Sequence, residues 1–186
     1  ATMEIVYGLN MLFTNATPLG GFTTEYTNVG SGKFLGLSYL VWIALVVAAI
    51  TWFIFNMTRH GKYMYAIGGN PQAAEVAGVP VKKTLIIIYA KAAAMYGLAG
   101  FMLGAKAGGA SVQLGYGYEM EAIAACTIGG VSVSGGRGKV SSAIIGVAVF
   151  EILKAALQFL GVNSNAQWIA LGIIIFVAIS LDVARK

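Results

Sequence analysis

The sequence contains little charge. Only 10% of its 186 residues are Asp, Glu, Lys or Arg, whereas 58% are hydrophobic. A soluble globular domain carries about 25% charged and about 45–50% apolar residues. The shortage of charge therefore excludes an ordinary soluble domain and predicts a membrane protein. The net charge is +5, but the basic residues lie between apolar runs, so we expect contact with membrane lipid and no nucleic-acid binding.

Cysteine and histidine are equally scarce. Cys126 and His60 are the single residues of their types. One cysteine cannot form an intrachain disulfide, and one Cys with one His cannot build a zinc site. The sequence also lacks a recognisable set of nucleophile, base and orienting group. We therefore expect the chain to be no enzyme and to bind no metal or cofactor itself.

Long apolar runs divide the chain into membrane segments. At 1.5 Å per residue, about 20 apolar residues cross a hydrocarbon core of about 30 Å. The run 122–134 is too short for this, which predicts a broken or re-entrant helix shielded by protein. We predict an all-α membrane protein, a polytopic helical bundle with about five membrane segments. These segments are 37–57, 84–105, 122–134, 140–160 and 166–181.

Residues 1–36 are predicted to lie outside the membrane. An apolar helix end at 3–13 precedes a loop at 14–36 that is rich in Thr, Gly and Asn. Because the chain opens in what resembles the tail of a helix, we expect it to be the C-terminal part of a longer protein.

The orientation follows from lysine and arginine, which favour the cytoplasmic side. If the loop 58–83 is cytoplasmic, alternation places 135–139 and the C-terminus on the same side. Eight of the 12 basic residues then lie inside, and the opposite orientation inverts this ratio. These eight are Arg59, Lys62, Lys82, Lys83, Arg137, Lys139, Arg185 and Lys186.

Three charged residues fall inside predicted membrane segments. Glu151 and Lys154 are three residues apart, so we expect them to pair on one helix face. Lys91 either extends its side chain back to the interface or serves in a translocation pathway. Glu119 and Glu121 are expected at the outer entrance of a helix, where the helix dipole favours carboxylates.

Glycine-rich stretches suggest close packing of helices. The sequence around Gly138-Lys139 is not a nucleotide-binding P-loop, because Val140 stands where a Ser or Thr is needed. Small residues let helix backbones approach, and they also leave room for a solute. Either role, packing or pathway, is open for four glycines: Gly100, Gly104, Gly129 and Gly130.

One short helix has both ends marked within the basic loop. Asn70 is a good N-cap, Pro71 suits the first helical position, and Gly78 suits the left-handed position after the last turn. Pro80 prevents continuation. About two helical turns are unstable alone, so we expect this helix to dock on another surface.

The stretch 59–81, RHGKYMYAIGGNPQAAEVAGVPV, resembles the signature of ATP-binding-cassette importer permeases for monosaccharides. The resemblance continues through 119–140, EMEAIAACTIGGVSVSGGRGKV, and 160–168, LGVNSNAQW. It covers essentially the whole chain and is closest to the galactose/methyl-galactoside branch, with ribose permeases next. Five residues depart from the usual pattern of the family and bear on the identity of the solute: Lys91, Arg137, Ser141, Ser142 and Lys154.

The resemblance implies a permease domain in the bacterial cytoplasmic (inner) membrane, with its C-terminus in the cytoplasm. It implies three partners: an ATP-binding subunit that holds ATP and Mg, a second permease copy in a homodimer or heterodimer, and a periplasmic or extracellular sugar-binding protein. The loop 58–83 would hold the coupling helix that docks into the ATPase. The coupling residues that carry over are Gly69, Asn70, Pro71, Ala73, Ala74, Glu75 and Gly78.

Two alternatives remain at this stage. Related permeases that import nucleosides or branched-chain amino acids share the same loop. A membrane scaffold or signalling subunit without transport activity is the alternative from another class.

Overall fold

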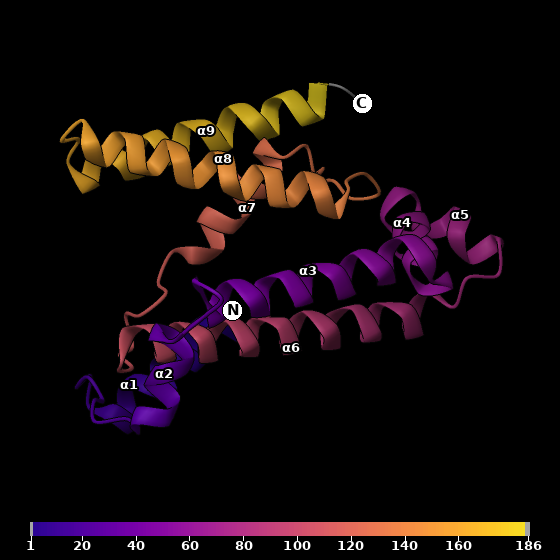
Figure 1. Cartoon of the computed structure of the whole chain (residues 1–186). Helices are drawn as coiled ribbons and strands as arrows, with labels where there is room; N and C mark the ends of the chain where they lie inside the picture. The colour runs from indigo at the N-terminus through magenta and orange to yellow at the C-terminus, as the bar shows by residue number, and fades with distance from the viewer. Residues whose placement is uncertain (1, 185–186) are drawn as a thin grey trace. The chain divides into compact units, whose positions relative to one another are not determined.

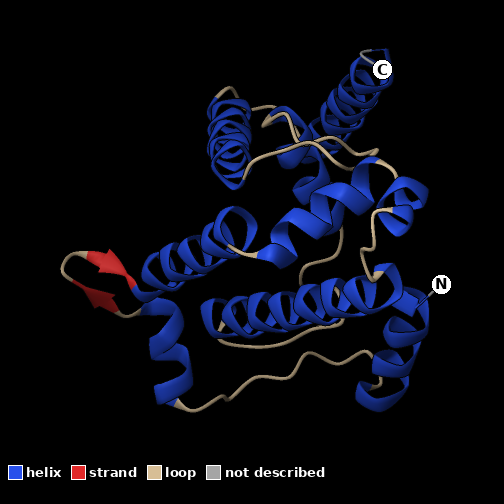
Figure 2. Ribbon diagram, turned by 90° about the vertical axis from the view of Figure 1, so that its right-hand side faces the viewer, coloured by secondary structure: helices blue, strands red, loops and turns tan. Residues whose placement is uncertain are grey.

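The computed structural model describes residues 2–184 and is built of helices with one small hairpin (Figures 1 and 2). The helices are α1 (Thr2–Thr14), α2 (Thr24–Ser31), α3 (Tyr39–Met57), α4 (Arg59–Gly69), α5 (Pro71–Val76), α6 (Val81–Ala107), α7 (Tyr118–Ile128), α8 (Val140–Phe159) and α9 (Ser164–Ala184). The hairpin strands are β1 (Lys33–Phe34) and β2 (Leu37–Ser38). The predicted all-α class is confirmed.

The chain forms two compact units. Unit 1 comprises Ala1–Val47 and Tyr89–Tyr116, and unit 2 comprises Ala48–Ile88 and Gly117–Lys186. The boundaries pass through α3 and α6, so each of these helices contributes to both units. Each unit is described by itself.

Unit 1 corrects the prediction that residues 14–36 are loop, because α2 and the hairpin lie within this stretch. Tyr26 on α2 donates its hydroxyl to the Phe101 carbonyl at 2.8 Å, and the two rings lie 4.9 Å apart. Gly30 sits directly against the backbone of Ala105, which is 2% exposed. These contacts with α6 stabilise a helix that the local composition does not favour.

The hairpin of unit 1 sets the start of α3. Both central turn residues, Leu35 and Gly36, have positive φ (51° and 81°), as in the turns that suit two-residue hairpins. Trp42 donates its indole N–H to the Phe34 carbonyl at 3.1 Å. The membrane segment predicted from residue 37 therefore becomes helical only at Tyr39.

In unit 2, α7 packs against both α8 and α9 (Figure 1). The core of this packing is Ala124, Ala125 and Phe150, each at most 3% exposed. Gly146 on α8 meets the backbones of Ala125 and Gly129. A side chain at this glycine would hold the two helices apart.

The helix ends differ from the predicted membrane segments. α6 begins at Val81, directly after Pro80, and includes Lys82 and Lys83 that the prediction assigned to the loop. The run 122–134 is helical only to Ile128, and α7 starts earlier, at Tyr118. The expectation of a short helix here agrees with the structure, although its bounds were wrong. Glu119 and Glu121 lie in the first turn of α7, as predicted.

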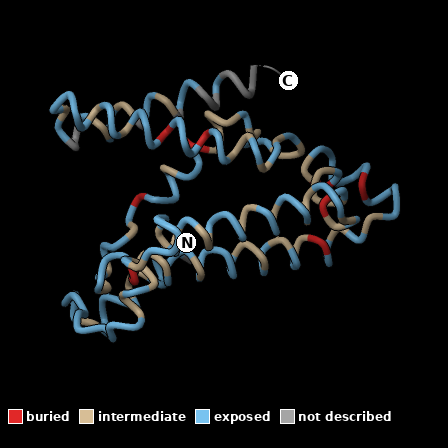
Figure 3. Tube along the Cα trace, viewed as in Figure 1, coloured by how far each residue is buried: buried red, intermediate tan, exposed pale blue. Residues whose placement is uncertain are grey.

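Three described helices, α3, α6 and α8, are long and apolar enough to cross a membrane. Few residues in their most apolar windows are buried, with 0%, 0% and 11% for the three helices (Figure 3). A large exposed apolar surface is unfavourable in water and favourable against lipid or further helices. The chain is therefore part of a multi-pass helical membrane protein, and five as the number of its segments stays a prediction.

Candidate coupling site

The basic loop between α3 and α6 contains two helices rather than the single one predicted. Thr58 caps α4 by accepting a hydrogen bond from the Gly61 N–H at 3.2 Å. The rings of Phe55 and Tyr65 meet edge to face at 5.7 Å. Gly61 permits close contact between α4 and α3, because its Cα faces the carbonyls of Ile54 and Phe55 at the end of α3.

The short helix α5 forms as the sequence predicts. Asn70 Oδ1 accepts a hydrogen bond from the Ala73 N–H at 3.0 Å, and Pro71 occupies the first turn. At the other end, Gly78 has φ +81° and donates to the Glu75 carbonyl, while Val79 donates to the Ala74 carbonyl, both at 3.0 Å. This pair of bonds is a Schellman motif. Both ends of α5 are thus fixed by local hydrogen bonds.

One side chain holds α5 in place and the others face outward. Ala74 is 4% exposed, and α5 packs on α4. Val76 is 91% exposed, a high value for a large apolar side chain. The remaining predicted coupling residues are also exposed: Gly69, Asn70, Pro71, Ala73, Glu75 and Gly78. The exposed face of α5 is an apolar and acidic surface on a rigid helix.

The end of α4 contacts the glycine turn between α7 and α8. A Cβ on Gly68 would lie 2.5 Å from the Gly136 nitrogen, and one on Gly136 would lie 2.7 Å from the Gly69 Cα. Tyr65 donates its hydroxyl to the Gly138 carbonyl at 2.8 Å. We call this contact, made by Tyr65, Gly68, Gly69, Gly135, Gly136 and Gly138, the glycine clasp. It joins two motifs that are more than 60 residues apart in the sequence.

The glycine clasp could not be found from either motif alone. The pairs Gly68-Gly69 and Gly135-Gly136 both suggest close approach of backbones, but nothing in the sequence says that they approach each other. The left-handed φ of Gly135 and Gly136, +90° and +72°, shows why the second pair must be glycine. A Cβ at any of the four positions except Gly69 would overlap the opposite backbone.

The four glycines that the sequence assigns either to helix packing or to a solute pathway have different surroundings. Gly104 faces the Tyr26 hydroxyl, and Gly129 faces the backbone of Ser142. Gly130 forms a left-handed turn with φ +83° and has open space beside it. Gly100 also has open space. The role of these glycines in a pathway stays a prediction.

The predicted ion pair between Glu151 and Lys154 on α8 is not the one that the structure shows. Lys154 Nζ lies 2.8 and 2.7 Å from the two carboxylate oxygens of Glu121. Among the residues that the structure describes, Lys154 forms its ion pair with Glu121. The predicted pairing of Lys154 with Glu151 is therefore wrong. α7 packs on α8 and brings Glu121 to Lys154, whereas Glu151 is exposed. Contact between helices decides the pairing, and spacing along one helix cannot reveal it.

Comparisons with known proteins agree with the membrane architecture. The family model described as "Branched-chain amino acid transport system / permease component" matches residues 2–178. The galactose/methyl galactoside import permease protein MglC of Escherichia coli is 43% identical over 100% of the chain and 58% of its own length. The ribose import permease protein RbsC of Bacillus subtilis is 37% identical over 98% of the chain and 57% of its own length.

The chain thus spans somewhat more than half the length of these two curated relatives. The corresponding permease of Treponema pallidum is 39% identical over 100% of the chain and 36% of its own length. No solved structure matches the chain. With the family match over nearly all its residues, the chain belongs to the permease-component family of the branched-chain amino acid transport system.

Proposed function

We propose that the chain is part of a permease subunit of an ATP-driven importer that carries a monosaccharide of the galactose or ribose class across the cytoplasmic membrane. The family match and the import permeases named among its relatives support this role. ATP and Mg are held by a separate ATP-binding subunit. A second permease copy completes the pathway, and a binding protein outside the membrane delivers the sugar.

The observation that carries the coupling part of this proposal is the construction of α5. Its ends are hydrogen-bonded, Ala74 is buried, and Val76 is 91% exposed. A short helix that is rigid and presents an apolar residue to water is suited to enter a cleft on a partner. Energy from ATP hydrolysis on that partner reaches the membrane helices through such a mechanical contact.

The glycine clasp supplies a route for this movement within unit 2. α5 packs on α4, and α4 contacts the turn that joins α7 to α8. A displacement of α5 by the ATPase is therefore passed to two membrane-embedded elements at once. Packed backbones transmit such displacements because no flexible side chain separates them.

The orientation of the loops is consistent with this role. The distribution of lysine and arginine predicts that 58–83 and 135–139 both face the cytoplasm. The clasp between Gly68 and Gly136 brings these two loops together, as the same side of a membrane requires. The ATPase is expected on this side.

An uptake panel tests the proposed solute class. The full-length permease, assembled with its ATPase and binding protein in vesicles, should take up galactose or ribose only when ATP is supplied. Unlabelled adenosine and leucine should leave this uptake within about twofold of its starting rate, since a polar site rejects solutes that leave its hydrogen-bonding groups unpaired. Inhibition by leucine equal to that by galactose would favour the amino acid alternative.

The scaffold alternative makes a different prediction. A scaffold or signalling subunit needs no ATPase, so affinity purification of the permease would recover no nucleotide-binding subunit and ATP would not alter solute uptake. Recovery of such a subunit, together with ATP-dependent uptake, excludes that alternative.

A further inference from the structure

A small pocket lies within unit 2 between the start of α7 and the neighbouring sides of α8 and α9. Its volume is about 210 Å³. Its polar lining comes from Glu121, Lys154, Gln158 and Gln167, and its aromatic lining from Phe150 and Trp168. Pockets for small molecules combine an apolar wall with a few polar groups in this way. The coupling role of α5 makes no use of any of these residues.

The charged groups of the pocket cancel each other. Lys154 Nζ donates to both oxygens of Glu121, and the side chains are 28% and 17% exposed, respectively. Charged residues within membrane segments are costly and mark solute or ion pathways by default. A paired lysine and glutamate present strong hydrogen-bonding groups without net charge.

These polar groups retain hydrogen-bonding capacity. A lysine ammonium has three donors and a carboxylate about four acceptor positions, and the ion pair uses only part of each. Gln167 donates from Nε2 to the Val162 carbonyl at 2.9 Å, which leaves its Oε1 as an acceptor. The pocket therefore offers donors and acceptors together, as a solute rich in hydroxyl groups requires.

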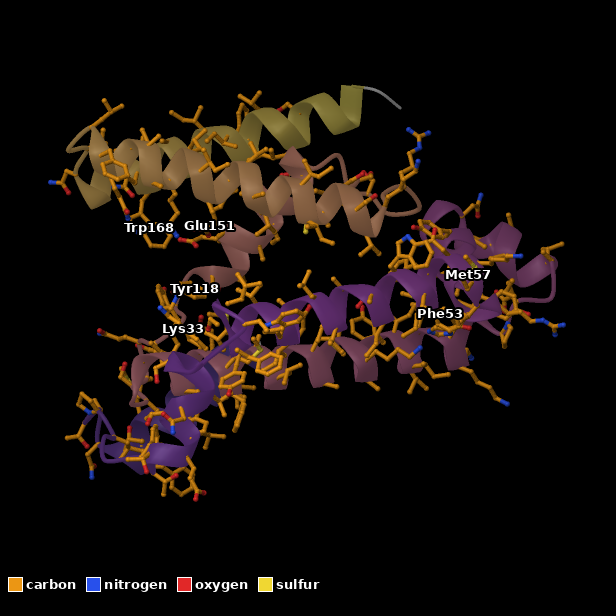
Figure 4. All side chains as sticks on the ribbon, in the orientation of Figure 1. Lys33, Phe53, Met57, Tyr118, Glu151 and Trp168 are labelled. Carbon is orange, nitrogen blue, oxygen red and sulfur yellow. The ribbon has the colours of Figure 1, made fainter. Side chains whose placement is uncertain are left out.

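Trp168 supplies the flat apolar surface. This residue is labelled in Figure 4. Its ring lies against Gly117 at the start of α7. A Cβ on Gly117, which has φ +85°, would lie 2.5 Å from that ring. The position of the indole thus depends on a glycine. Trp168 is still 48% exposed, so part of its ring is open to a ligand, and a sugar ring can place its C–H face on such a surface.

We propose that this pocket is a contact site for an uncharged monosaccharide on its way through the permease, with Trp168 stacking on the sugar ring and the Glu121–Lys154 pair binding its hydroxyl groups. This inference rests on the proposed transport function and names the residues that recognise the solute. Lys154 is six residues before Leu160, or about 9 Å along α8. In the predicted orientation this end faces the side from which the sugar arrives.

The charge of the pocket distinguishes between solutes. An amino acid carries a carboxylate and an ammonium group, and both must compete with an ion pair that is already formed. Breaking a partly buried pair leaves each charge without its partner, which is strongly unfavourable. A neutral sugar binds to the intact pair, so this pocket favours a sugar over an amino acid.

Two tryptophans of equal exposure allow a matched test. Trp168 is 48% exposed and Trp52 on α3 is 47% exposed. In the full-length transporter, Trp168→Ala should lower galactose uptake at saturating sugar by at least about tenfold, because aromatic anchors in a site contribute more than the surrounding contacts. Trp52→Ala should leave uptake within about twofold, since most surface substitutions have small effects. Equal uptake by the two variants would overturn the proposal.

Further variants separate recognition from folding. Trp168→Phe keeps a stacking surface and should restore most of the uptake lost in Trp168→Ala. The double variant E121Q/K154Q keeps amide donors and acceptors without charge, and it should change the ratio of galactose to ribose uptake. An unchanged ratio, or equal loss in Trp168→Phe and Trp168→Ala, would contradict the site.

The same assay distinguishes a failure of this inference from a failure of the transport function. If the unmodified transporter takes up neither galactose nor ribose, the proposed function is wrong, and so is the proposed sugar site. If it takes up a sugar and Trp168→Ala does so equally well, only the site is wrong.

Discussion

Val76→Asp should lower ATP-driven sugar uptake at least about tenfold, as expected for an interface residue that contributes 1.4 kcal/mol or more. Val76 is 91% exposed in this chain, so a charge there does not disturb the packing of α5 on α4. Only a partner that buries the side chain makes the charge unfavourable. Uptake in vesicles and ATP hydrolysis by the purified complex measure the effect.

Val133 provides the matched control. It is a 53% exposed valine in the turn between α7 and α8, so Val133→Asp adds the same charge to another exposed valine of unit 2. It should retain uptake within about twofold, since exposed substitutions away from a contact have small effects. Equal losses in the two variants would show that charge alone, and not a contact at α5, reduces transport.

Neighbouring positions on α5 should behave differently. Glu75→Arg changes the exposed face and should uncouple the complex in the same way as Val76→Asp. Ala74→Asp places a carboxylate at a position that is 4% exposed, so it should detach α5 from α4 and also lower the stability of the permease. A loss of stability in Glu75→Arg would contradict the separation between a docking face and a buried face.

Gly68→Ala should impair transport while the adjacent Gly69→Ala does not. The new methyl group at residue 68 would lie 2.5 Å from the Gly136 nitrogen, whereas nothing lies within 4 Å of a Cβ at residue 69. Overpacking costs about 1–3 kcal/mol. In an exposed helix, Gly→Ala is otherwise favourable by up to about 1 kcal/mol. The two variants therefore shift stability in opposite directions.

Thermal unfolding in detergent and sugar uptake together measure this pair. We expect Gly68→Ala to reduce both the unfolding temperature and uptake, and Gly69→Ala to raise the unfolding temperature slightly and preserve uptake. Gly69 belongs to the motif that the chain shares with monosaccharide importer permeases. A severe loss of uptake in Gly69→Ala alone would therefore show that this glycine contacts the ATPase directly. If both variants retain the unfolding temperature and the uptake of the unmodified permease, the glycine clasp has no part in the mechanism.

The elements that the sequence predicts well are those fixed by local chemistry. Asn70, Pro71 and Gly78 mark α5 because each acts on the backbone within one turn of itself. The long membrane helices follow from apolar length alone. Their ends are less predictable, since the hairpin before Tyr39 and the extension of α6 back to Val81 depend on single turns.

The elements that the sequence misses are those fixed by distant contacts. α2 exists because Tyr26 and Gly30 meet α6, and the ion pair of Lys154 is with Glu121 because α7 packs on α8. Neither partner is marked in the sequence. The glycine clasp is a similar case, in which both halves suggest close packing and neither identifies the other.

Crosslinking from α5 tests the central claim most directly. In a background without other cysteines, which includes Cys126→Ser, a photoreactive benzophenone is attached to a cysteine at residue 76 or, as the control, at residue 133, within the complete transporter. Irradiation should join residue 76, and not residue 133, to the ATP-binding subunit, with a yield that changes when ATP is added. No product from residue 76, or equal products from both positions, would contradict the assignment of α5 as the contact through which ATP hydrolysis drives this permease.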